Sequence, residues 1–475
     1  MNILIVNTNN TFPPIFPIGA AYVLPNLLSR GHNIRFLDPS FRDTDWHILV
    51  QNEVALESTD IVFFIVRNID TCNPSELHTC YDHINGLINA ISDAYKKVTT
   101  IMVGAGFSIL PTELMKKTGA DFGIVGDGEE AVPMLVEAIE AGGDVSKIPG
   151  VVYRRTDNSI CVSSPSRTKL ETGLHRDSLQ KLSVENYLKN SGCVGVPTRR
   201  GCPFNCSYCT YPIIEGSRFR LRHPMAVCKD IKVLVNCGFK HIWFVDSLFT
   251  LPKDQAHAIC DELMRQELHK KIQWTAYATP LGFDFELAFK MKKAGCCELI
   301  FGTDSACDEM LLSLNKSFGW DEIRNATLAA QKAGLDFAHH LLFGAPGETP
   351  ATAKITLQRM ESLSCRLGLD FGIRIYPGTK ICEQAIRAGT IKPDHNFLDP
   401  VFYVSPFVEN QIDNILSDFN STHDKCRYFG RDGHPHPYTS KELCETYQQG
   451  IIGPYWKILE EHLKTATSID KKNIA

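Results

Sequence analysis

The sequence lacks the features that mark membrane-spanning, secreted and repetitive proteins. It contains no run of about 20 apolar residues, so we expect no transmembrane helix. The first apolar run, Ile3–Val6, is short and follows no basic leader, which indicates a strand and not a secretion signal. No low-complexity tract or short-period repeat is present. These absences favour a cytoplasmic, globular protein.

The chain also lacks an excess of charge of either sign. Its 49 Lys and Arg residues nearly balance 54 Asp and Glu residues, for a net charge of −5, and no basic stripe stands out. We therefore expect no nucleic-acid partner. Hydrophobic residues at 44% and charged residues at 22% are typical of folded soluble proteins. A length of 475 residues corresponds to about three domains of roughly 150 residues each.

Cysteine is abundant, with 17 residues, an odd total that fits free thiols in a reducing compartment. Three of them, Cys202, Cys206 and Cys209, share the segment RRGCPFNCSYCTYP (199–212) with C-x3-C-x2-C spacing. Thiolates suit iron–sulfur clusters, and three on one loop can hold three irons of a 4Fe–4S cube, leaving the fourth iron open. The alternatives are three ordinary thiols or part of a zinc site, but no second C-x2-C pair completes a zinc site.

Residues 1–150 alternate short apolar runs with helical stretches. The strand-like runs are 2–8, 34–37, 60–66, 100–103 and 121–125. This alternation predicts a doubly wound, parallel α/β sheet of the Rossmann-like kind, with ligands at the carboxyl ends of its strands. Residues 151–192 are more polar and are expected to form a linker with a small hairpin.

A second alternating series covers residues 193–390. Its strand-like runs are 193–197, 241–245, 272–278, 298–302, 337–343 and 371–376. Six βα units predict a partial (β/α)6 barrel of the TIM type, with its chemistry at the carboxyl ends of the strands. Residues 391–475 are expected to be mostly helical, with an amphipathic helix around 440–463, and to help select the substrate.

The barrel motifs occur in an order that resembles the radical S-adenosylmethionine (SAM) superfamily. After the cysteine motif come WFVDSLF (243–249), AGCCELIFGTDSACDEML (294–311), HHLLFGAPGET (339–349) and RIYPGT (374–379). The resemblance implies that SAM binds the open iron and that one electron cleaves it to a 5′-deoxyadenosyl radical. Asp304 stands where the family usually has Glu, which shortens its reach. The implied cofactor contacts are Tyr208, Asp246, Ser247, Thr303, Asp304, Gly344, Pro346 and Arg374.

Three of these barrel residues have open alternatives. Arg374 could bind the SAM carboxylate or an acidic group of the substrate. His339 and His340 alternate faces on one predicted strand, so one of them could face the barrel interior, although a structural role is favoured for both.

Residues 1–150 resemble the cobalamin-binding domain that precedes one class of radical SAM enzymes. The segments that carry this resemblance are NILIVNTNN…PIGAAYVLPNLLSRGHNIRFLD (2–38), DIVFFIVRNID (60–70), VGAGFSILP (103–111) and DFGIVGDGEEAVPMLVEAI (121–139). The small residues of GAG are expected to let the backbone approach a bulky ligand. The alternative is an ordinary flavodoxin-like domain whose glycines serve turns. The implied cobalamin contacts are Asn7, Thr8, Pro17, Gly19, Arg67, Asn68, Gly104, Ala105, Gly106, Gly126, Gly128 and Glu129.

One family feature is missing from this domain. Many cobalamin domains carry Asp-x-His-x-x-Gly after the first strand, whereas the loop 7–19 contains no His, and Asp45-Trp46-His47 is only a partial match. We expect Arg67 at the lower face of the corrin instead. A guanidinium has no lone pair to donate to cobalt, which favours methyl transfer from methylcobalamin. The alternative is an Arg67–Asp70 pair that clamps the loop.

The sequence therefore predicts a cobalamin-dependent radical SAM methyltransferase that acts on a carbon or phosphorus atom of a small metabolite or natural product. The expected cofactors are a 4Fe–4S cluster, SAM and cobalamin, with Cys202, Cys206, Cys209 and Arg67 as the catalytic residues. An external one-electron reductant such as flavodoxin or ferredoxin is implied. The alternatives are a radical rearrangement or cyclisation without methyl transfer, a peptide substrate, and a cobalamin-binding sensor or redox iron–sulfur module.

Overall fold

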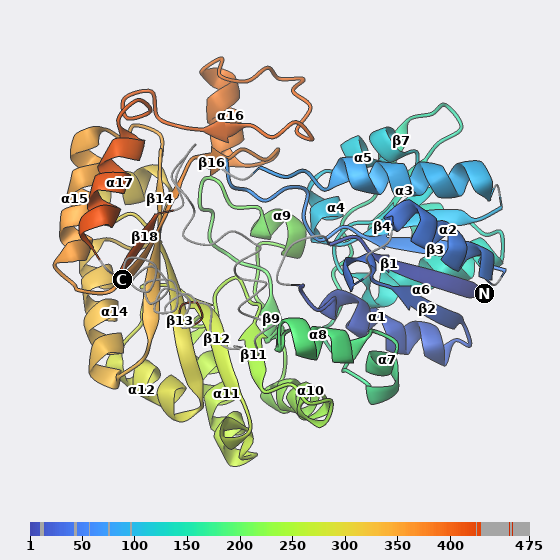
Figure 1. The fold of residues 1–475 in the computed structure, drawn as a ribbon, viewed down its shortest axis with the longest axis horizontal. Helices are drawn as coiled ribbons and strands as arrows, with labels where there is room; N and C mark the ends of the chain where they lie inside the picture. Colours follow the sequence, from blue (N-terminus) through green and yellow to red (C-terminus); the bar gives the residue numbers. More distant parts are fainter. Residues whose placement is uncertain are drawn as a thin grey trace, which may run out of the picture.

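The computed structural model consists of two seven-stranded sheets, each covered by helices, which lie side by side (Figure 1). It describes residues 1–9, 14–41, 45–56, 58–74, 77–95, 97–423, 425–428, 456 and 458. We refer to the two sheets as the N-terminal sheet and the barrel sheet. The N-terminal sheet has the strand order β2-β1-β3-β4-β5-β6-β7, and the barrel sheet has the order β18-β15-β14-β13-β12-β11-β8.

The first five strands of the N-terminal sheet are parallel, as the sequence predicts. Their order, 2-1-3-4-5, is that of flavodoxin-like sheets, whose ligands bind where the strand order reverses between β1 and β3. Continuous apolar runs such as IVFFI in β3 form strands that are buried on both faces by helices. The elements are β1 (Asn2–Asn7), α1 (Ile18–Ser29), β2 (Asn33–Leu37), α2 (Trp46–Leu56), β3 (Ile61–Ile65), α3 (Tyr81–Ala94), β4 (Thr99–Val103), α4 (Ala105–Ile109), α5 (Pro111–Thr118), β5 (Phe122–Ile124) and α6 (Gly128–Glu140).

The segment after residue 150 continues the N-terminal sheet. Strands β6 (Val151–Arg154) and β7 (Ile160–Val162) form an antiparallel hairpin, and β6 pairs with β5. The hairpin therefore extends the sheet edge, and the connection to the barrel begins after β7. Two short helices, α7 (Arg176–Gln180) and α8 (Val184–Asn190), complete that connection.

The barrel sheet is parallel throughout, with helices outside it (Figure 1). Its core is apolar and aromatic, with Phe244, Phe249 and Trp274 in mutual contact. The strands are β8 (Cys193–Val196), β11 (His241–Phe244), β12 (Gln273–Ala278), β13 (Cys296–Asp304), β14 (Phe337–Phe343), β15 (Arg366–Phe371) and β18 (Cys426–Tyr428). The main helices are α10 (Pro224–Asn236), α11 (Lys253–Arg265), α12 (Phe285–Lys293), α13 (Asp308–Ser313), α14 (Trp320–Ala333), α15 (Pro350–Glu361), α16 (Lys380–Arg387) and α17 (Ile412–Thr422).

The prediction for the sixth barrel strand is wrong by five residues. The strand occupies Arg366–Phe371, whereas residues 373–374 form a two-residue strand, β16 (Ile373–Arg374), antiparallel to β17 (Phe402–Tyr403). Helix α15 ends at Glu361, which leaves the apolar run RLGLDF free to pair with β14. A seventh strand, β18, was not predicted. The predicted helix at 440–463 lies outside the described residues, apart from Trp456 and Ile458.

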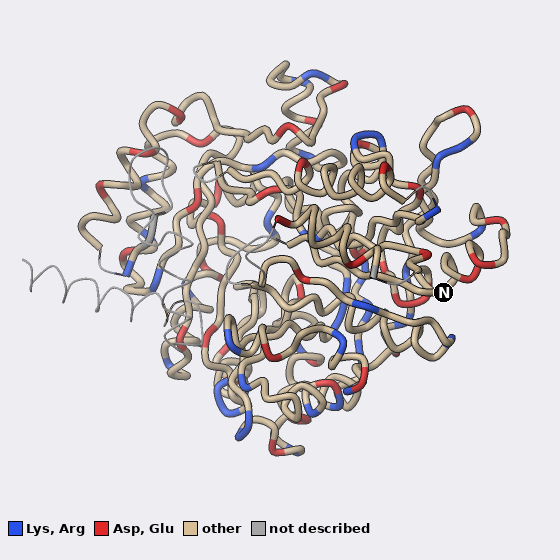
Figure 2. Tube along the Cα trace, turned by 45° about the vertical axis from the view of Figure 1, so that its right-hand side comes forward, with Lys and Arg blue, Asp and Glu red and all other residues tan. Residues whose placement is uncertain are grey.

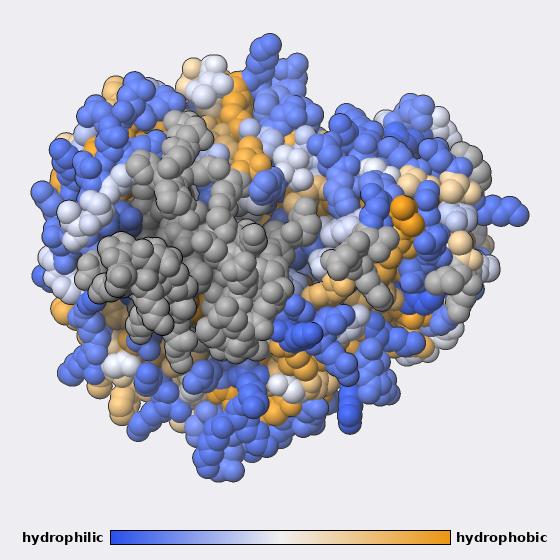
Figure 3. All heavy atoms as spheres, viewed as in Figure 1, coloured by the Kyte–Doolittle hydropathy of each residue, from blue (hydrophilic) through white to orange (hydrophobic). Residues whose placement is uncertain are grey.

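The surface carries mixed charge. Lys and Arg are interspersed with Asp and Glu along both halves of the chain (Figure 2). The visible face is mostly hydrophilic, with smaller apolar patches (Figure 3). Among the described residues, no helix combines the length and apolar character that crossing a membrane requires.

Candidate functional site

An apolar-walled cavity lies between the N-terminal sheet and the barrel, and we call it the interdomain cavity. Its volume is about 660 Å³. It opens at the carboxyl ends of β1, β3, β4 and β5, the edge at which flavodoxin-like sheets bind ligands. Of the predicted cobalamin contacts, those that line it are Asn7, Pro17, Gly19, Arg67, Gly104, Ala105, Gly126, Gly128 and Glu129.

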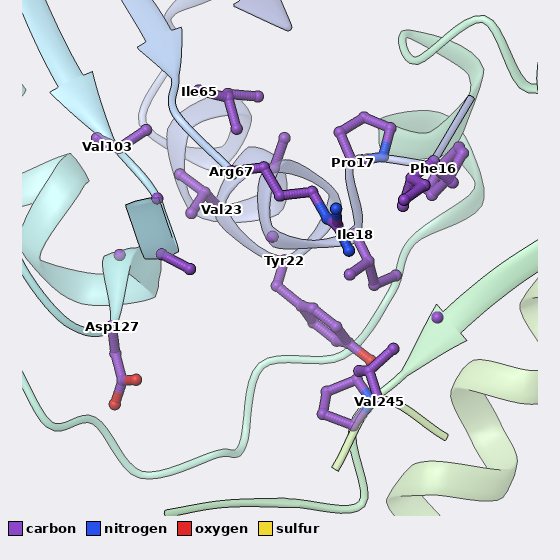
Figure 4. Close-up of a pocket in the computed structure, with 18 of the residues that line it drawn as sticks. Phe16, Pro17, Ile18, Tyr22, Val23, Ile65, Arg67, Val103, Asp127 and Val245 are labelled. Carbon is purple, nitrogen blue, oxygen red and sulfur yellow. The ribbon is translucent and has the colours of Figure 1, made fainter. Parts of the chain in front are cut away.

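Arg67 projects into this cavity from the end of β3, toward Pro17 and Ile18 (Figure 4). The Arg67–Asp70 clamp that the sequence left open does not form, because Asp70 pairs with Arg374. Among the described residues, no carboxylate forms an ion pair with Arg67. The loop thus presents a cation to whatever occupies the cavity.

Two glycines at this edge are required by the protein's own backbone. Gly104 has φ +115°, and a Cβ there would lie 2.5 Å from the Val66 carbonyl oxygen. Gly126 has φ +86°, and a Cβ there would lie 2.4 Å from the Ser166 carbonyl oxygen. Gly106 does not line the cavity and is crowded by the backbone of 66–68. The expectation that all of GAG makes room for a ligand is therefore corrected for Gly106, where loop packing is the reason for glycine.

Glu129 takes part in a buried ion network that joins the two halves of the molecule. Its carboxylate pairs with Arg200, which also pairs with Asp127 at 2.8 Å, and Asp127 binds Arg220 as well. Glu129 thereby fixes the position of the strand pair β9 (Arg199–Arg200) and β10 (Arg220–Leu221), which precedes and follows the cysteine loop. Thr8 and Asn68 do not line the cavity, and the Thr8 hydroxyl donates to the Ile65 carbonyl at 2.8 Å.

The cysteine loop begins directly after β9 and is held at several points. The Cys202 amide donates to the Gly216 carbonyl at 3.0 Å, the Ser207 amide donates to the Leu314 carbonyl at 2.9 Å, and the Cys209 amide donates to the Cys206 carbonyl at 3.2 Å. Cys202, Cys206 and Cys209 are free thiols. Burial raises the pKa of Cys206, and it raises the pKa of Cys209 to about 12, so both thiols need a strong cation to ionise.

The three loop thiols suit a cluster better than a single ion. Among the described residues, no three Cys, His, Asp or Glu side chains lie close enough together to hold one metal ion. A 4Fe–4S cube takes each thiolate on a different iron, so its ligands do not converge on one point. The donor set therefore fits a cluster.

Arg199, three residues before Cys202, is a buried cation that lacks a hydrogen-bond acceptor. Its exposed fraction is 1%, and none of its three guanidinium nitrogens has a hydrogen-bond partner in the part of the chain that the structure describes. It lies over the Phe219 ring, 4.3 Å from the centroid, and lines the interdomain cavity. Burial without a partner is costly for a charge, and it lowers the pKa of Arg199. Arg199 therefore fits an occupant of this region that brings hydrogen-bond acceptors, and sequence reasoning missed it.

A second cavity, which we call the barrel-mouth cavity, lies at the carboxyl ends of the barrel strands. Its volume is about 680 Å³. The cysteine loop contributes Tyr208–Tyr211 to its wall, and the N-terminal domain contributes Thr71–Pro74. Three aromatic residues, Tyr211, Trp243 and Tyr277, line both this cavity and the interdomain cavity. The two cavities therefore meet at the cysteine loop, which the sequence alone did not indicate.

Asp304 and Tyr208, two predicted SAM contacts, form one polar group in the barrel-mouth cavity. The Tyr208 hydroxyl donates to Asp304 Oδ2 at 2.5 Å, and Lys316 Nζ lies 2.6 Å from the same oxygen. Asp304 adopts φ +63°, a conformation that few non-glycine residues take, at a bulge in β13. Its charge is therefore neutralised by Lys316 before any ligand binds.

Several other predicted SAM contacts lie away from both cavities and have structural partners. Asp246 accepts hydrogen bonds from the Thr198 amide at 2.7 Å and from the Thr198 hydroxyl at 2.6 Å, which ties β11 to the start of the cysteine loop. The Thr303 hydroxyl contacts His339 Nδ1 at 2.6 Å behind the sheet. These side chains therefore stabilise the strands and loops that surround the two cavities. The predicted SAM contacts that line neither cavity are Asp246, Ser247, Thr303, Gly344 and Pro346.

Arg374 lines the barrel-mouth cavity and also has partners within the protein. It lies after the sixth strand, where it forms a buried ion pair with Asp70 at 2.9 Å and donates to the carbonyls of Ile375 and Phe397. The exposed fractions of the two charged side chains are 3% and 0%. Arg374 therefore joins the barrel to the N-terminal domain, and its guanidinium is already engaged on three sides.

The two adjacent histidines of β14 have different roles. His339 is buried between Thr303 and Thr327, and both of its ring nitrogens contact hydroxyls, so it is structural. His340 lines the barrel-mouth cavity, and its buried Nε2 has no hydrogen-bond partner. Beside it, Asp370 reaches the same cavity from β15. Sequence reasoning missed Asp370 because it placed that strand too late.

Comparison with known proteins agrees with this architecture. Residues 196–360 match the model of the radical SAM superfamily. The chain is 26% identical over 409 residues to an uncharacterized methyltransferase of Pyrococcus horikoshii, covering 84% of this chain and 86% of the relative. It is 24% identical over 458 residues to tryptophan 2-C-methyltransferase of Streptomyces laurentii, covering 82% and 76%.

Solved structures share the whole fold. The radical SAM methyltransferase TsrM of Kitasatospora setae, solved with tryptophan and a SAM analogue, superposes with a TM-score of 0.88 at 21% identity, covering 99% of each chain. The cobalamin-dependent SAM radical enzyme OxsB superposes with a TM-score of 0.70 at 13% identity, covering 94% of this chain and 71% of OxsB. Residues 196–360 therefore match the radical SAM superfamily, and along its length the chain has the fold of TsrM and OxsB.

Proposed function

We propose that this protein is a cobalamin-dependent radical SAM methyltransferase acting on a small molecule. The observation that carries the proposal is the meeting of the interdomain and barrel-mouth cavities at the cysteine loop, with Tyr211, Trp243 and Tyr277 shared between them. Methyl transfer through a carrier needs a carrier site and an acceptor site in contact. The relatives support this reading, since one methylates tryptophan by its name and one solved relative holds cobalamin and a 4Fe–4S cluster.

The residues present fit these cofactors. Cys202, Cys206 and Cys209 would hold the cluster, and the interdomain cavity, with Arg67 and Arg199 as unpaired cations, would hold cobalamin. When bound, the cluster supplies single electrons, SAM supplies a methyl group on a sulfonium, and cobalamin supplies a methyl carrier. Arg67 would lie at the lower face of the corrin and give cobalt no protein ligand, because a guanidinium has no free lone pair.

The protein's own contribution is to exclude water and to hold the groups in register. The apolar wall of the interdomain cavity, including Phe16, Ile65 and Val103, excludes water from the carrier site. The Arg200 network and the Arg374–Asp70 pair fix the two halves against each other, so the distance between the two cavities stays set. A one-electron donor of the flavodoxin or ferredoxin class would keep the metals reduced.

The test is anaerobic reconstitution with iron, sulfide and hydroxocobalamin, followed by incubation with SAM and titanium(III) citrate. We expect S-adenosylhomocysteine to form in an amount equal to the bound cobalamin. Sustained turnover of SAM to 5′-deoxyadenosine without S-adenosylhomocysteine would instead establish the rearrangement or cyclisation alternative. A loaded protein that neither binds nor consumes SAM would point to a sensor or redox module and refute the proposal.

A further inference from the structure

We propose that His340 and Asp370 form the proton-accepting pair of the methyl-transfer site and that the barrel-mouth cavity takes a ring substrate bearing an N–H or O–H group. The inference rests on the proposed function and adds the acceptor residues and the substrate class to it. Both side chains line the cavity and come from adjacent parallel strands, β14 and β15. His340 Nδ1 lies 3.9 Å from Asp370 Oδ2.

The strand register places this pair on the inner face of the barrel. His340 lies opposite Gly368, and Leu342 lies opposite Asp370, so both polar residues share a face because side chains alternate along a strand. A Cβ at residue 368 would lie 3.2 Å from the His340 ring, so glycine there leaves room for the imidazole. The relative position of His340 and Asp370 therefore follows from the pairing of β14 with β15.

The other charges of the cavity are already neutralised. Asp304 is paired with Lys316, and Arg374 is paired with Asp70. Among the described residues, Asp370 has no Lys or Arg partner, and His340 Nε2 has no acceptor or donor. Within the part of the chain that the structure describes, this pair is therefore the charged group of the cavity that no Lys, Arg or second carboxylate neutralises.

The protonation of the pair supports its role. The side chains of His340 and Asp370 are 29% and 45% exposed; the surrounding protein, together with the like charge of Asp304, raises the pKa of Asp370 to about 7, and the surrounding protein lowers the pKa of His340 to about 4. The titratable groups that face them are Asp304 from β13 and Tyr277 from β12. Near neutral pH, Asp370 can therefore gain or lose a proton, while His340 stays neutral and can hydrogen-bond to the substrate.

The step balances with the methyl group that SAM brings. A substrate R–H and SAM give R–CH3, S-adenosylhomocysteine and one proton. The new C–C bond takes its electron pair from the ring, the C–H bond breaks, and its electron pair restores the ring. The ring N–H or O–H, hydrogen-bonded to the pair, helps to push electrons toward the reacting carbon, and Asp370 takes up the released proton.

The walls of the cavity favour a flat ring. Aromatic residues contribute on several sides, and Trp243 and Tyr277 lie with ring centroids 5.5 Å apart. Rings prefer offset or edge contacts with other rings at this spacing. The aromatic lining residues are Tyr208, Tyr211, Trp243, Tyr277, Phe371 and Tyr376.

The experiment uses the reconstituted holoenzyme and two half-reactions. The first measures S-adenosylhomocysteine formed once per cobalamin without any acceptor. The second adds L-tryptophan, L-tyrosine or L-cyclohexylalanine as probes and measures methylated product by mass spectrometry. We expect Asp370→Asn to keep the first half-reaction within twofold of wild type, to bind probe within about tenfold, and to lose 10²–10⁴-fold in methyl transfer. Asp370→Glu restores part of that loss.

A substrate-independent readout and a matched control complete the test. Carbodiimide labels protonated carboxyls, so labelling of Asp370 followed by peptide mass spectrometry should show a midpoint near pH 7, and His340→Asn should shift that midpoint. Asp336→Asn makes the same substitution at an exposed barrel position and should leave both half-reactions unchanged.

Each contrary outcome has a distinct meaning. Wild type that forms no S-adenosylhomocysteine overturns the proposed function. Wild type that completes the first half-reaction but methylates only cyclohexylalanine, or no probe, overturns the substrate class. If Asp370→Asn methylates a probe at the wild-type rate, the proposal that His340 and Asp370 accept the proton is wrong. The same holds if carbodiimide labels Asp370 only below pH 5.

Discussion

The interface between the two halves of the molecule should depend strongly on one carboxylate, Asp230. It lies in α10 and is fully buried, with an exposed fraction of 0%. Asp230 Oδ2 accepts from the Tyr22 hydroxyl at 2.7 Å and from Arg222 Nη2 at 2.6 Å, and Oδ1 accepts from the Leu174 amide at 2.8 Å. Tyr22 belongs to α1 of the N-terminal domain and lines the interdomain cavity (Figure 4).

The expected loss of stability follows from these contacts. Asp230→Asn keeps the shape of the side chain but leaves the Arg222 guanidinium, which is 2% exposed, without a counter-charge. Breaking a buried pair in this way costs about 3–5 kcal/mol. Tyr22→Phe removes two hydrogen bonds with charged groups, the one donated to Asp230 and the one accepted from Arg222, at a cost of about 1.5–3 kcal/mol for each. Because both substitutions remove the same bond, the double variant should lose less than the sum of the two.

The assay is urea unfolding of the reconstituted protein at 25 °C, followed by circular dichroism, with cobalamin affinity measured by equilibrium dialysis. Asp336→Asn is the matched control, because its pair with Arg366 is exposed, and it should change the free energy of unfolding by no more than about 1 kcal/mol. An Asp230→Asn variant within about 1 kcal/mol of wild type would refute the reasoning, since the Arg222 charge would then be compensated elsewhere. A double variant that loses the full sum would show that Tyr22 and Asp230 act independently.

Four further outcomes are expected. A Cys202→Ala, Cys206→Ala, Cys209→Ala triple variant should lose iron, sulfide and SAM consumption yet still bind cobalamin, and loss of cobalamin binding as well would contradict the separation of the two sites. Arg67→Ala should change the absorption spectrum of bound cobalamin and slow turnover, and an unchanged spectrum and rate would remove Arg67 from the corrin. Arg199→Met should lower iron content or cobalamin affinity, whereas Arg218→Met, an exposed cation on the same segment, should not; equal behaviour would leave Arg199 without a ligand. Burial raises the pKa of Glu348 to about 7, so the folded state holds a proton more tightly than the unfolded chain and stability should fall as pH rises from about 4.5 to 7; Glu348→Gln should flatten that dependence in urea unfolding at pH 5 and 8, and an equal slope in both proteins would speak against it.

The sequence predicted the parts of this protein that depend on local pattern. Apolar runs such as 61–65 and 337–343 became buried parallel strands because strand and helix periodicity is written into neighbouring residues. The cysteine loop was identified by spacing alone, since three thiols within eight residues must lie on one loop whatever the rest of the chain does. The missing His of the loop 7–19 likewise needed no coordinates.

The tertiary structure decided which side chains are free to act. The sequence predicts that Arg374 contacts SAM or the substrate. The fold instead brings Asp70, 304 residues away, into a buried ion pair with it. The sequence left open a pair between Arg67 and Asp70, but Asp70 pairs with Arg374, so no carboxylate among the described residues pairs with Arg67, which faces the cavity. Asp370 and His340 meet because two strands are in register, a long-range contact that no local pattern records.

The physical reason for this division is the range of the forces involved. Hydrophobic periodicity and metal-ligand spacing are patterns among residues that are close in the sequence. The sequence by itself therefore determined the two sheets and the cysteine loop. The pairing of charges depends on which residues become neighbours after folding, because an unpaired charge is costly to bury and takes any partner that the fold provides. The tertiary structure therefore decided that Asp304, Glu129 and Arg374 are paired with other charges of the protein, whereas Arg67, Arg199 and Asp370 have no Lys, Arg, Asp or Glu partner among the described residues.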